Sequence, residues 1–348
     1  MIHMRQTFGL FKFVVALSLL LAFSANAENA DPQSEKREAL GWLKKIQVAA
    51  QKLNYSGTFV YQQANEMRTS RITHVLDGKN EIEKLEILDG KPREYIRNNE
   101  EVICYVPEVK TLLVEKRVTH DIFPAILAMN PADLAEYYDV RKDVVGRVAG
   151  RDCQAIILEP TDNLRYGYRL WADKATGLLL RAQTLNEKHE AIEQIAFTEV
   201  SVGNIDRNRV KPSFPNTNGW HVENATMSQA HLSGWTVKSL PPGFRKIREV
   251  RRIVSDASSP SATATSRGSR VSVQPSQHEV AQMVFSDGLA AISVFIEPGA
   301  QSRTEGSMQQ GAMNIIGKRY GDFWLTIVGE VPSSAIRQVA NSIEFKSK

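Results

Sequence analysis

The sequence contains none of the short motifs that mark common catalytic and metal-binding sites. Its seven histidines never fall in a metal-binding spacing such as His-Glu-x-x-His, and its two cysteines do not form a Cys-x-x-Cys pair. It has no Gly-x-Ser-x-Gly nucleophile motif, no Ser-x-x-Lys and no phosphate-cradling glycine loop. We therefore expect a protein that is not an enzyme and uses no cofactor or metal, although a triad assembled from distant residues would leave no such motif.

Charged side chains are balanced in sign and do not gather into an evident site. Lys and Arg total 43 and Asp and Glu total 39, and two of the basic residues, Arg5 and Lys12, lie in the N-terminal segment. So small an excess gives no argument for a nucleic-acid partner. Glu81, Glu83 and Glu86 alternate with apolar residues along one expected strand. We interpret them as a solvent-facing row rather than as an acid/base pair.

Long apolar runs are absent except near the N-terminus, where residues 1–27 have the features of an export signal peptide. Basic residues precede the apolar run from Phe13 to Phe23, and the pattern Ala25-x-Ala27 supplies the small residues of a cleavage site. The run is shorter than the roughly 20 apolar residues that a membrane span needs. No cysteine follows it to carry a lipid anchor. We expect cleavage after Ala27 and a mature chain outside the cytoplasm.

Cys104 and Cys153 are the only cysteines. An exported chain meets an oxidising compartment, so a disulfide between them is one alternative. Each cysteine also lies among apolar residues, so two buried free thiols are the other alternative. The spacing of the two residues does not decide between these.

A helix and a long strand-rich region follow the N-terminal segment. Asp31 and Pro32 are a typical N-cap and first helical residue, and apolar residues recur at helical spacing over residues 34–53. Short alternating runs separated by Asp-Gly turns then predict an antiparallel meander. A second helical pattern covers residues 122–138. We expect residues 28–202 to form one α+β domain with a large antiparallel sheet.

The rest of the chain is expected to form a linker and a second, smaller domain. Residues 203–219 carry Asn, Pro and charges with little periodicity, as an interdomain linker does. Residues 220–348 contain fewer alternating runs and end in a helical pattern over residues 333–343, which predicts a smaller antiparallel sheet with one helix. Residues 255–277 have the Ser, Thr and Pro content of a mobile loop.

Aromatic side chains line one side of two predicted strands, first in the run NYSGTFVYQQ and again in LRYGYRLWAD. Two interpretations stay open. The rows belong to an ordinary core covered by a helix, or they form the concave wall of a half-open barrel that accepts an acyl chain or an apolar peptide. The candidates for lining such a cavity are Tyr55, Phe59, Tyr61, Tyr166 and Tyr168.

The second unit contains a basic run, FRKIREVRRIV, from Phe244 to Val254. A strand with this charge can bind an acidic segment or an anionic headgroup. It can equally present a charged face to solvent. An exposed sheet edge in this unit can also take up an added strand from a partner.

Several blocks of sequence, in order, carry a resemblance to a known family. They are LNYSGTFVYQQ, LDGKPREYIR, a long block that includes LRYGYRLWADKATGLLL, and in the second unit LPPGFRKI, FSDGLAAISVFIE and TIVGEVP. With these blocks the sequence resembles the RseB/MucB family of periplasmic regulators of the sigma-E envelope-stress response. The resemblance covers essentially the whole mature chain.

The resemblance implies a fold and a function. The larger domain is expected to look like the lipoprotein carrier LolA, an unclosed antiparallel half-barrel with helices over its concave side, and the smaller domain is expected to be a sheet with one helix. The family implies a periplasmic negative regulator that binds the periplasmic domain of an anti-sigma factor related to RseA or MucA and shields it from regulated proteolysis. A lipid-type signal, such as lipopolysaccharide or a misplaced lipoprotein, is expected to release it.

The resemblance also implies that the smaller domain and the domain junction contact the partner. We expect these contacts to be made by surface groups of one matching region: Trp235, Pro241, Phe244, Arg245 and Arg248. The identity of the lipid and the formation of a homo-oligomer stay open.

Two other functions stay open. A periplasmic lipid or lipoprotein carrier would use the half-barrel alone, and a hydrolase would use a triad that no motif reveals. The second domain favours the regulator, because a simple carrier has no need of the blocks FSDGLAAISVFIE and TIVGEVP.

Overall fold

The fold is described from a computed structural model of the chain. The structure describes residues 31–116, 131–225, 227–229, 232–255, 277–299 and 303–346. The predicted signal peptide with its cleavage after Ala27 lies outside the described residues, as does the predicted loop 255–277 apart from its two end residues.

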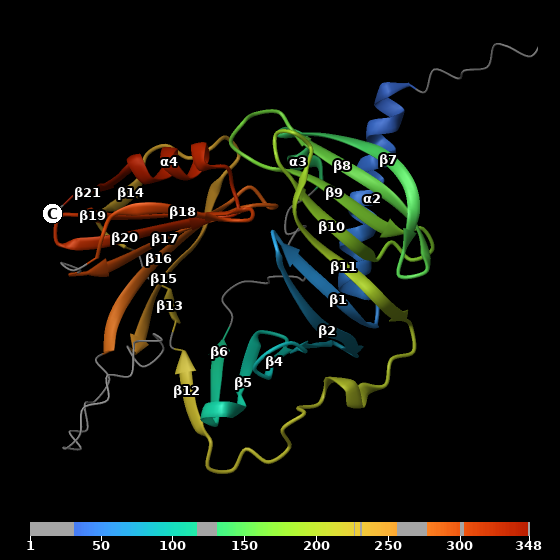
Figure 1. The fold of residues 1–348 in the computed structure, drawn as a ribbon, viewed down its shortest axis with the longest axis horizontal. Coiled ribbons are helices and arrows are strands. Elements are labelled where there is room, and N and C mark those ends of the chain that lie inside the picture. Colours follow the sequence, from blue (N-terminus) through green and yellow to red (C-terminus); the bar gives the residue numbers. More distant parts are fainter. Residues whose placement is uncertain are drawn as a thin grey trace, which may run out of the picture.

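Twelve strands form one large sheet, which with the helices beside it makes up the larger lobe (Figure 1). The strands are β1 (Tyr55–Gln63), β2 (Glu66–Asp77), β3 (Asn80–Ile87), β4 (Arg93–Asn98), β5 (Glu101–Val106), β6 (Thr111–Lys116), β7 (Tyr138–Val148), β8 (Arg151–Pro160), β9 (Gly167–Asp173), β10 (Leu179–Leu185), β11 (Ala191–Val202) and β12 (His221–Ala225). Their order is β12-β6-β5-β4-β3-β2-β1-β11-β10-β9-β8-β7, so the sheet has two edges and is not closed into a barrel. Its neighbours are antiparallel except β12 and β6, which are parallel.

Helix α2 (Pro32–Lys52) lies against the inner face of this sheet, along β7, β8 and β10 (Figure 1). The Asp31 carboxylate accepts a hydrogen bond of 3.2 Å from the backbone N–H of Gln33, and proline occupies the first helical position. The short helix α3 (Pro131–Leu134) lies beside α2. The helix predicted over residues 34–53 is confirmed. Its buried face consists of Ala39, Leu43, Ile46, Ala49 and Ala50.

The larger sheet bends at β1, which is one of its two central strands. Gly57 allows the bend, because a Cβ atom there would lie only 2.4 Å from the carbonyl oxygen of Glu199 on β11. The pairing of β1 with β11 shifts register between Thr58 and Phe59. A glycine beside such an irregularity curves a sheet. The sequence of the first strand therefore helps to shape the open half-barrel.

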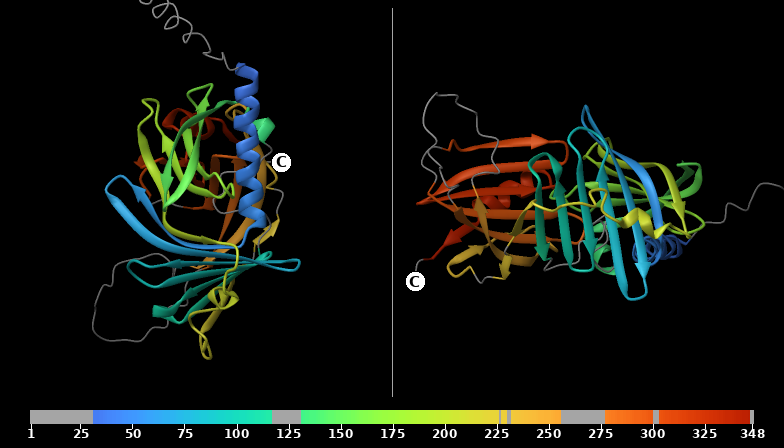
Figure 2. Two further views of the ribbon diagram at one scale, coloured as in Figure 1. Left: turned by 90° about the vertical axis from the view of Figure 1, so that its right-hand side faces the viewer. Right: turned by 90° about the horizontal axis from the view of Figure 1, so that it is seen from below.

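The smaller lobe contains a second antiparallel sheet with one helix (Figures 1 and 2). Its elements are β13 (Met227–Gln229), β14 (Trp235–Val237), β15 (Arg245–Ser255), β16 (Gln277–Ser286), β17 (Ala291–Pro298), β18 (Gly306–Gln310), β19 (Met313–Tyr320), β20 (Phe323–Gly329), α4 (Ser333–Asn341) and β21 (Ile343–Phe345). Seven strands follow the order β13-β15-β16-β17-β20-β19-β18, and β14 pairs separately with β21. Helix α4 buries Ile336 and Val339 in one core with Ile292 and Ile327 of the sheet. The expected α+β architecture of a large unclosed sheet and a smaller sheet with one helix is confirmed.

The predicted linker crosses the outer face of the larger sheet, and we call residues 203–219 the strap. It contains the 3-10 helix η3 (Arg207–Val210). Ile205 and Val210 bury their side chains against Val75. Strand β12, which follows the strap, pairs with β6 of the larger sheet although it lies in the predicted second unit. The predicted domain limits of 28–202 and 220–348 stay a prediction.

A buried ion pair fastens the strap to the sheet. Lys84 on β3 and Glu94 on β4 are only 4% and 2% exposed, and Lys84 Nζ lies 2.9 Å from Glu94 Oε2. The same ammonium donates to the carbonyl of Lys211 at 2.9 Å and to Ser213 Oγ at 2.7 Å. The backbone N–H of Ser213 donates to Glu94 Oε1 at 3.1 Å. Both ions are thus paired and hydrogen-bonded, as burial of charge requires.

We predict that Glu94→Gln lowers the free energy of unfolding by about 3 kcal/mol, because it leaves the Lys84 ammonium buried without its main counter-ion. The double variant Lys84→Met/Glu94→Leu should recover most of this loss, since it removes both charges together. Urea denaturation measures both. Glu66→Gln is the control, because Glu66 pairs with Arg68 at the surface, where both side chains are more than 60% exposed. Equal small losses in all three variants would contradict the prediction.

Candidate functional site

A histidine on the inner face of the larger sheet is held between two acceptors. His74 is 1% exposed. Its Nδ1 lies 2.7 Å from the carbonyl oxygen of Leu53, and its Nε2 lies 3.2 Å from Glu81 Oε1. Both ring nitrogens are therefore engaged with the protein's own groups, which gives His74 a structural role here.

The carboxylates next to His74 correct one expectation from the sequence. Glu81 and Glu83 were expected in a solvent-facing row, but both pair with the guanidinium of Arg97, which is 7% exposed. The hydrogen bond from His74, followed by the contacts with Arg97, lowers the pKa of Glu81 to about 2 although partial burial opposes the shift. The sequence does not reveal the cluster because its members come from β2, β3 and β4.

The predicted cavity residues lie mostly in the core rather than on an open wall. Tyr55, Phe59, Tyr166 and Tyr168 are each 6% exposed or less, and Tyr61 is half-buried. The Tyr55 ring stacks on His74 with 5.1 Å between ring centroids. Two pockets among the described residues have volumes of about 420 and 470 Å³, and none of the five side chains lines either of them. That these residues bind an acyl chain stays a prediction.

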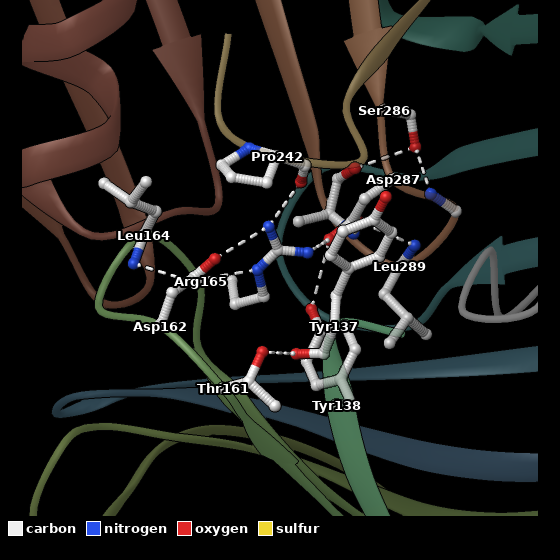
Figure 3. A network of polar contacts seen from close by, with 12 residues as sticks. Tyr137, Tyr138, Thr161, Asp162, Leu164, Arg165, Pro242, Ser286, Asp287 and Leu289 are labelled. Carbon is white, nitrogen blue, oxygen red and sulfur yellow. Dashed lines mark hydrogen bonds and ion pairs between the residues drawn. The ribbon is translucent and has the colours of Figure 1, made fainter. Parts of the chain in front are cut away.

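The two lobes meet at a buried arginine (Figure 3). Arg165 lies in the loop between β8 and β9, and its side chain is 0% exposed. Its Nη1 lies 3.0 Å from Asp287 Oδ2 in the turn between β16 and β17. Its Nε donates to Asp162 Oδ1 at 3.1 Å, and its Nη2 donates to the carbonyl oxygen of Pro242. The guanidinium thus joins the larger lobe to two separate segments of the smaller lobe.

Aromatic rings enclose this guanidinium. Its carbon lies 4.9 Å from the ring centroid of Tyr137, 5.5 Å from that of Tyr138 and 5.7 Å from that of Phe244. Rings at these distances attract a cation and exclude water from it. Gly243, with φ of +80°, admits the Tyr137 ring, because a Cβ at this position would lie 2.4 Å from that ring. The turn in LPPGF therefore needs glycine for both its backbone angle and its close contact.

Asp287 is held as firmly as Arg165. It is 1% exposed, and its Oδ1 accepts from the backbone N–H groups of Leu289 at 3.0 Å and Ala290 at 2.9 Å. The hydroxyl of Tyr138 donates to Asp287 Oδ2 at 3.3 Å. Burial raises the pKa of Tyr138 well above its ordinary value, so this hydroxyl keeps its proton. The carboxylate is satisfied by groups of both lobes.

Further polar contacts between the lobes surround this centre. Asn314 Nδ2 donates to the Tyr166 hydroxyl at 3.2 Å. Ser334 Oγ donates to the carbonyl oxygen of Asn163 at 2.8 Å. Gln63 Nε2 donates to the carbonyl oxygen of Gln310 at 3.0 Å. Beside this last contact lies the groove of about 420 Å³, lined by Gln62, Ala64, Ala191, Ile192, Glu193, Gln194 and Gly311.

Three of the five predicted partner-binding residues are not surface groups. Trp235, Pro241 and Phe244 are buried, so the expectation of surface groups is wrong for them. Trp235 packs in the core of the smaller lobe, where its ring centroid lies 4.7 Å from that of Phe345. Arg245 is exposed and Arg248 is half-buried. Trp235, Pro241 and Phe244 are buried because apolar rings leave water when a core is available.

The disulfide between Cys104 and Cys153 is not formed. Both are buried free thiols, on β5 and β8. Seven strands lie between β5 and β8 in the sheet. A disulfide needs Cα atoms within about 7 Å of each other. Burial raises the pKa of both thiols, which further reduces their reactivity.

Within the part of the chain that the structure describes, no three or more His, Cys, Asp or Glu side chains are arranged to hold a metal ion. Over the same residues, none of the helices has both the length and the apolar character that crossing a membrane requires.

Family models match nearly the whole chain. The model described as the MucB/RseB N-terminal domain matches residues 38–214, and the model described as the MucB/RseB C-terminal domain matches residues 229–344. The chain is 30% identical over 326 residues to the sigma factor AlgU regulatory protein MucB of Pseudomonas aeruginosa, covering 90% of this chain and 93% of that protein. It is 25% identical over 333 residues to the sigma-E factor regulatory protein RseB of Escherichia coli, covering 95% and 97%.

Solved structures of MucB share the fold. A crystal structure of MucB in complex with MucA(peri) aligns with a TM-score of 0.65 and 28% identity, covering 89% of this chain and 100% of that one. A complex of Pseudomonas aeruginosa MucA and MucB gives a TM-score of 0.67 at the same identity and coverage. MucB alone gives 0.62 at 27% identity, covering 89% of this chain and 98% of that one. The similarity therefore extends over both lobes.

We predict that the Glu81 carboxylate makes stability depend on pH. Its folded pKa is about 2, whereas an unfolded glutamate titrates near about 4.3. Its contribution is therefore present above about pH 4.3 and is lost as the pH falls toward the folded value. Glu81→Gln should lower stability at pH 7 and flatten the pH dependence in this window. Thermal unfolding from pH 7 to 2.5 measures this, and parallel curves for wild type and variant would contradict it.

Proposed function

The chain belongs to the MucB/RseB family, and on that premise we propose that it is a periplasmic negative regulator of a sigma-E-type stress response. It binds the periplasmic segment of a membrane anti-sigma factor. The observation that supports this most directly is the likeness of both lobes to MucB solved with MucA(peri). The protein reaches the periplasm through its signal peptide, which is cleaved after Ala27.

The protein acts by binding rather than by catalysis. The two lobes present separate surfaces on either side of one polar junction, so an extended partner segment can contact both. Exposed edges supply backbone groups for such a segment, and β18 is an edge strand whose five residues are all exposed. Arg245 and the neighbouring basic side chains of β15 suit an acidic stretch of the partner.

Binding protects the partner by covering its first cleavage site, and a lipid releases it by linkage. A ligand that binds the free regulator better than the complex must weaken partner binding by the same factor. Such couplings are typically about 1–3 kcal/mol. The lipid enters the concave side of the larger lobe, near Tyr61, which is the half-buried member of the predicted aromatic row.

We expect the purified mature protein to bind the synthetic periplasmic segment of the anti-sigma factor from the same organism. Isothermal titration calorimetry measures the affinity, and the rate at which a periplasmic protease cuts the segment should fall several-fold in the presence of excess regulator. A segment of the same composition in scrambled order is the control. Absence of binding together with unchanged cleavage would contradict the proposal.

Lipopolysaccharide added to the complex should restore cleavage of the segment. Native mass spectrometry of the purified protein supplies a second measurement. Bound acyl species without any affinity for the segment would instead favour a lipid or lipoprotein carrier.

A further inference from the structure

We propose that the network around Arg165 is a latch that fixes the relative orientation of the two lobes, and that the partner segment binds only the latched orientation. The first half concerns the protein alone. The second half, that the partner segment binds only the latched orientation, rests on the proposed function and states how partner binding would be regulated.

The lobes are joined at two places that lie apart from each other in the structure (Figure 1). One is covalent, where the chain leaves β12 at the edge of the larger sheet and enters β13 at the edge of the smaller sheet. The other is the non-covalent junction of Arg165 with Asp287 and Pro242. If the junction opens, the crossing from β12 to β13 is the connection that remains between the lobes in the described part of the chain. Two lobes joined in this way can rotate about a hinge.

The chemistry of the junction suits a contact with two states. A buried ion pair adds little net stability, because desolvation of both ions offsets their attraction. When the lobes separate, both ions return to water together, so opening leaves no buried charge unpaired. Two neighbouring cross-lobe contacts are hydrogen bonds, from Asn314 to Tyr166 and from Ser334 to Asn163, and water can replace these. Apolar contacts accompany them, since Leu164 packs against the core of the smaller lobe and Leu289 against that of the larger. The polar contacts of the junction therefore contribute more to the orientation of the lobes than to the free energy that holds them together.

The strap confines the motion to the hinge. Residues 203–219 are fastened to the larger sheet by Lys84 and Glu94 and by buried apolar side chains. Because the strap moves with the larger lobe, it cannot act as a loose tether. Rotation about the β12–β13 crossing would change the spacing between surfaces on the two lobes. It would therefore weaken the binding of a partner segment that bridges both lobes.

The test opens the latch and measures orientation and binding separately. Arg165→Met removes the cation while keeping a side chain of similar length. Arg97→Met is the matched control, because it removes a guanidinium that is 7% exposed and that pairs with Glu81 and Glu83 within the larger lobe. Dyes attached through Lys188→Cys and Asp322→Cys, two exposed positions on different lobes, report the distance between the lobes by energy transfer. The native cysteines are buried, and the parent protein is the labelling blank.

We expect Arg165→Met to broaden the distance distribution and to weaken binding of the partner segment by about tenfold or more, a usual size for such coupling. The matched control should keep the wild-type distance and affinity. An unchanged distance distribution in Arg165→Met would overturn the latch. A changed distribution with unchanged affinity would overturn its role in recognition. Failure of the wild-type protein to bind the segment would instead refute the proposed function and leave the distance measurement valid.

A cross-link between the lobes distinguishes loss of the latch from misfolding of the Arg165→Met variant. Asn163→Cys and Ser334→Cys place two thiols where the lobes touch, since Ser334 Oγ and the Asn163 carbonyl oxygen are 2.8 Å apart. Once oxidised, this pair should restore segment binding to Arg165→Met, and reduction should abolish the rescue. Equal affinity of the oxidised and reduced forms would contradict the latch.

Discussion

The burial of one guanidinium constrains how the two lobes of this protein fit together. Arg165 has no exposed surface, and a charge in such a place needs partners in good geometry. Its partners come from three stretches of chain: its own loop through Asp162, and the smaller lobe through Asp287 and the Pro242 carbonyl. All of these are satisfied together only when both lobes are folded and docked in this orientation. The rings that surround the guanidinium keep water out, which strengthens each polar contact and raises the cost of a poor fit.

This arrangement suits the proposed regulator, which must hold a partner firmly and still release it. In the proposed function both lobes contact the partner, so a change in their spacing would reach every contact at once without unfolding either core. Each lobe has its own hydrophobic core, one around Leu43 and Ile156 and the other around Ile292 and Val339. The polar junction between them contributes specificity, and the separate cores contribute stability. Under that proposal, a signal that acts on the larger lobe would affect the partner without any chemical step.

Local features of the fold follow from the sequence, whereas its long-range polar contacts do not. Helix α2 is predictable because capping by Asp31 and the apolar spacing act within one segment. The strands are predictable from alternation and Asp-Gly turns, and the blocks shared with the family indicate the two-lobed architecture. The pairing of Arg165 with Asp287, and of Arg97 with Glu81 and Glu83, joins residues from separate elements, so no local pattern marks it. The same limit explains the error about Trp235, whose burial depends on the distant Phe345.

The parallel pairing of β12 with β6 has a consequence for the order of folding. The chain is made from the N-terminus onward, so β1 is the first strand available. It pairs with the much later strand β11, where Tyr55 lies opposite Val202. Strand β6 likewise remains an edge until residues 221–225 arrive. The larger lobe therefore cannot complete its sheet until nearly two thirds of the chain is available. Such long-range pairing is slow, and the waiting edges are open to aggregation. One edge of β1 and one edge of β6 therefore stay exposed until β11, the strap and β12 have been made.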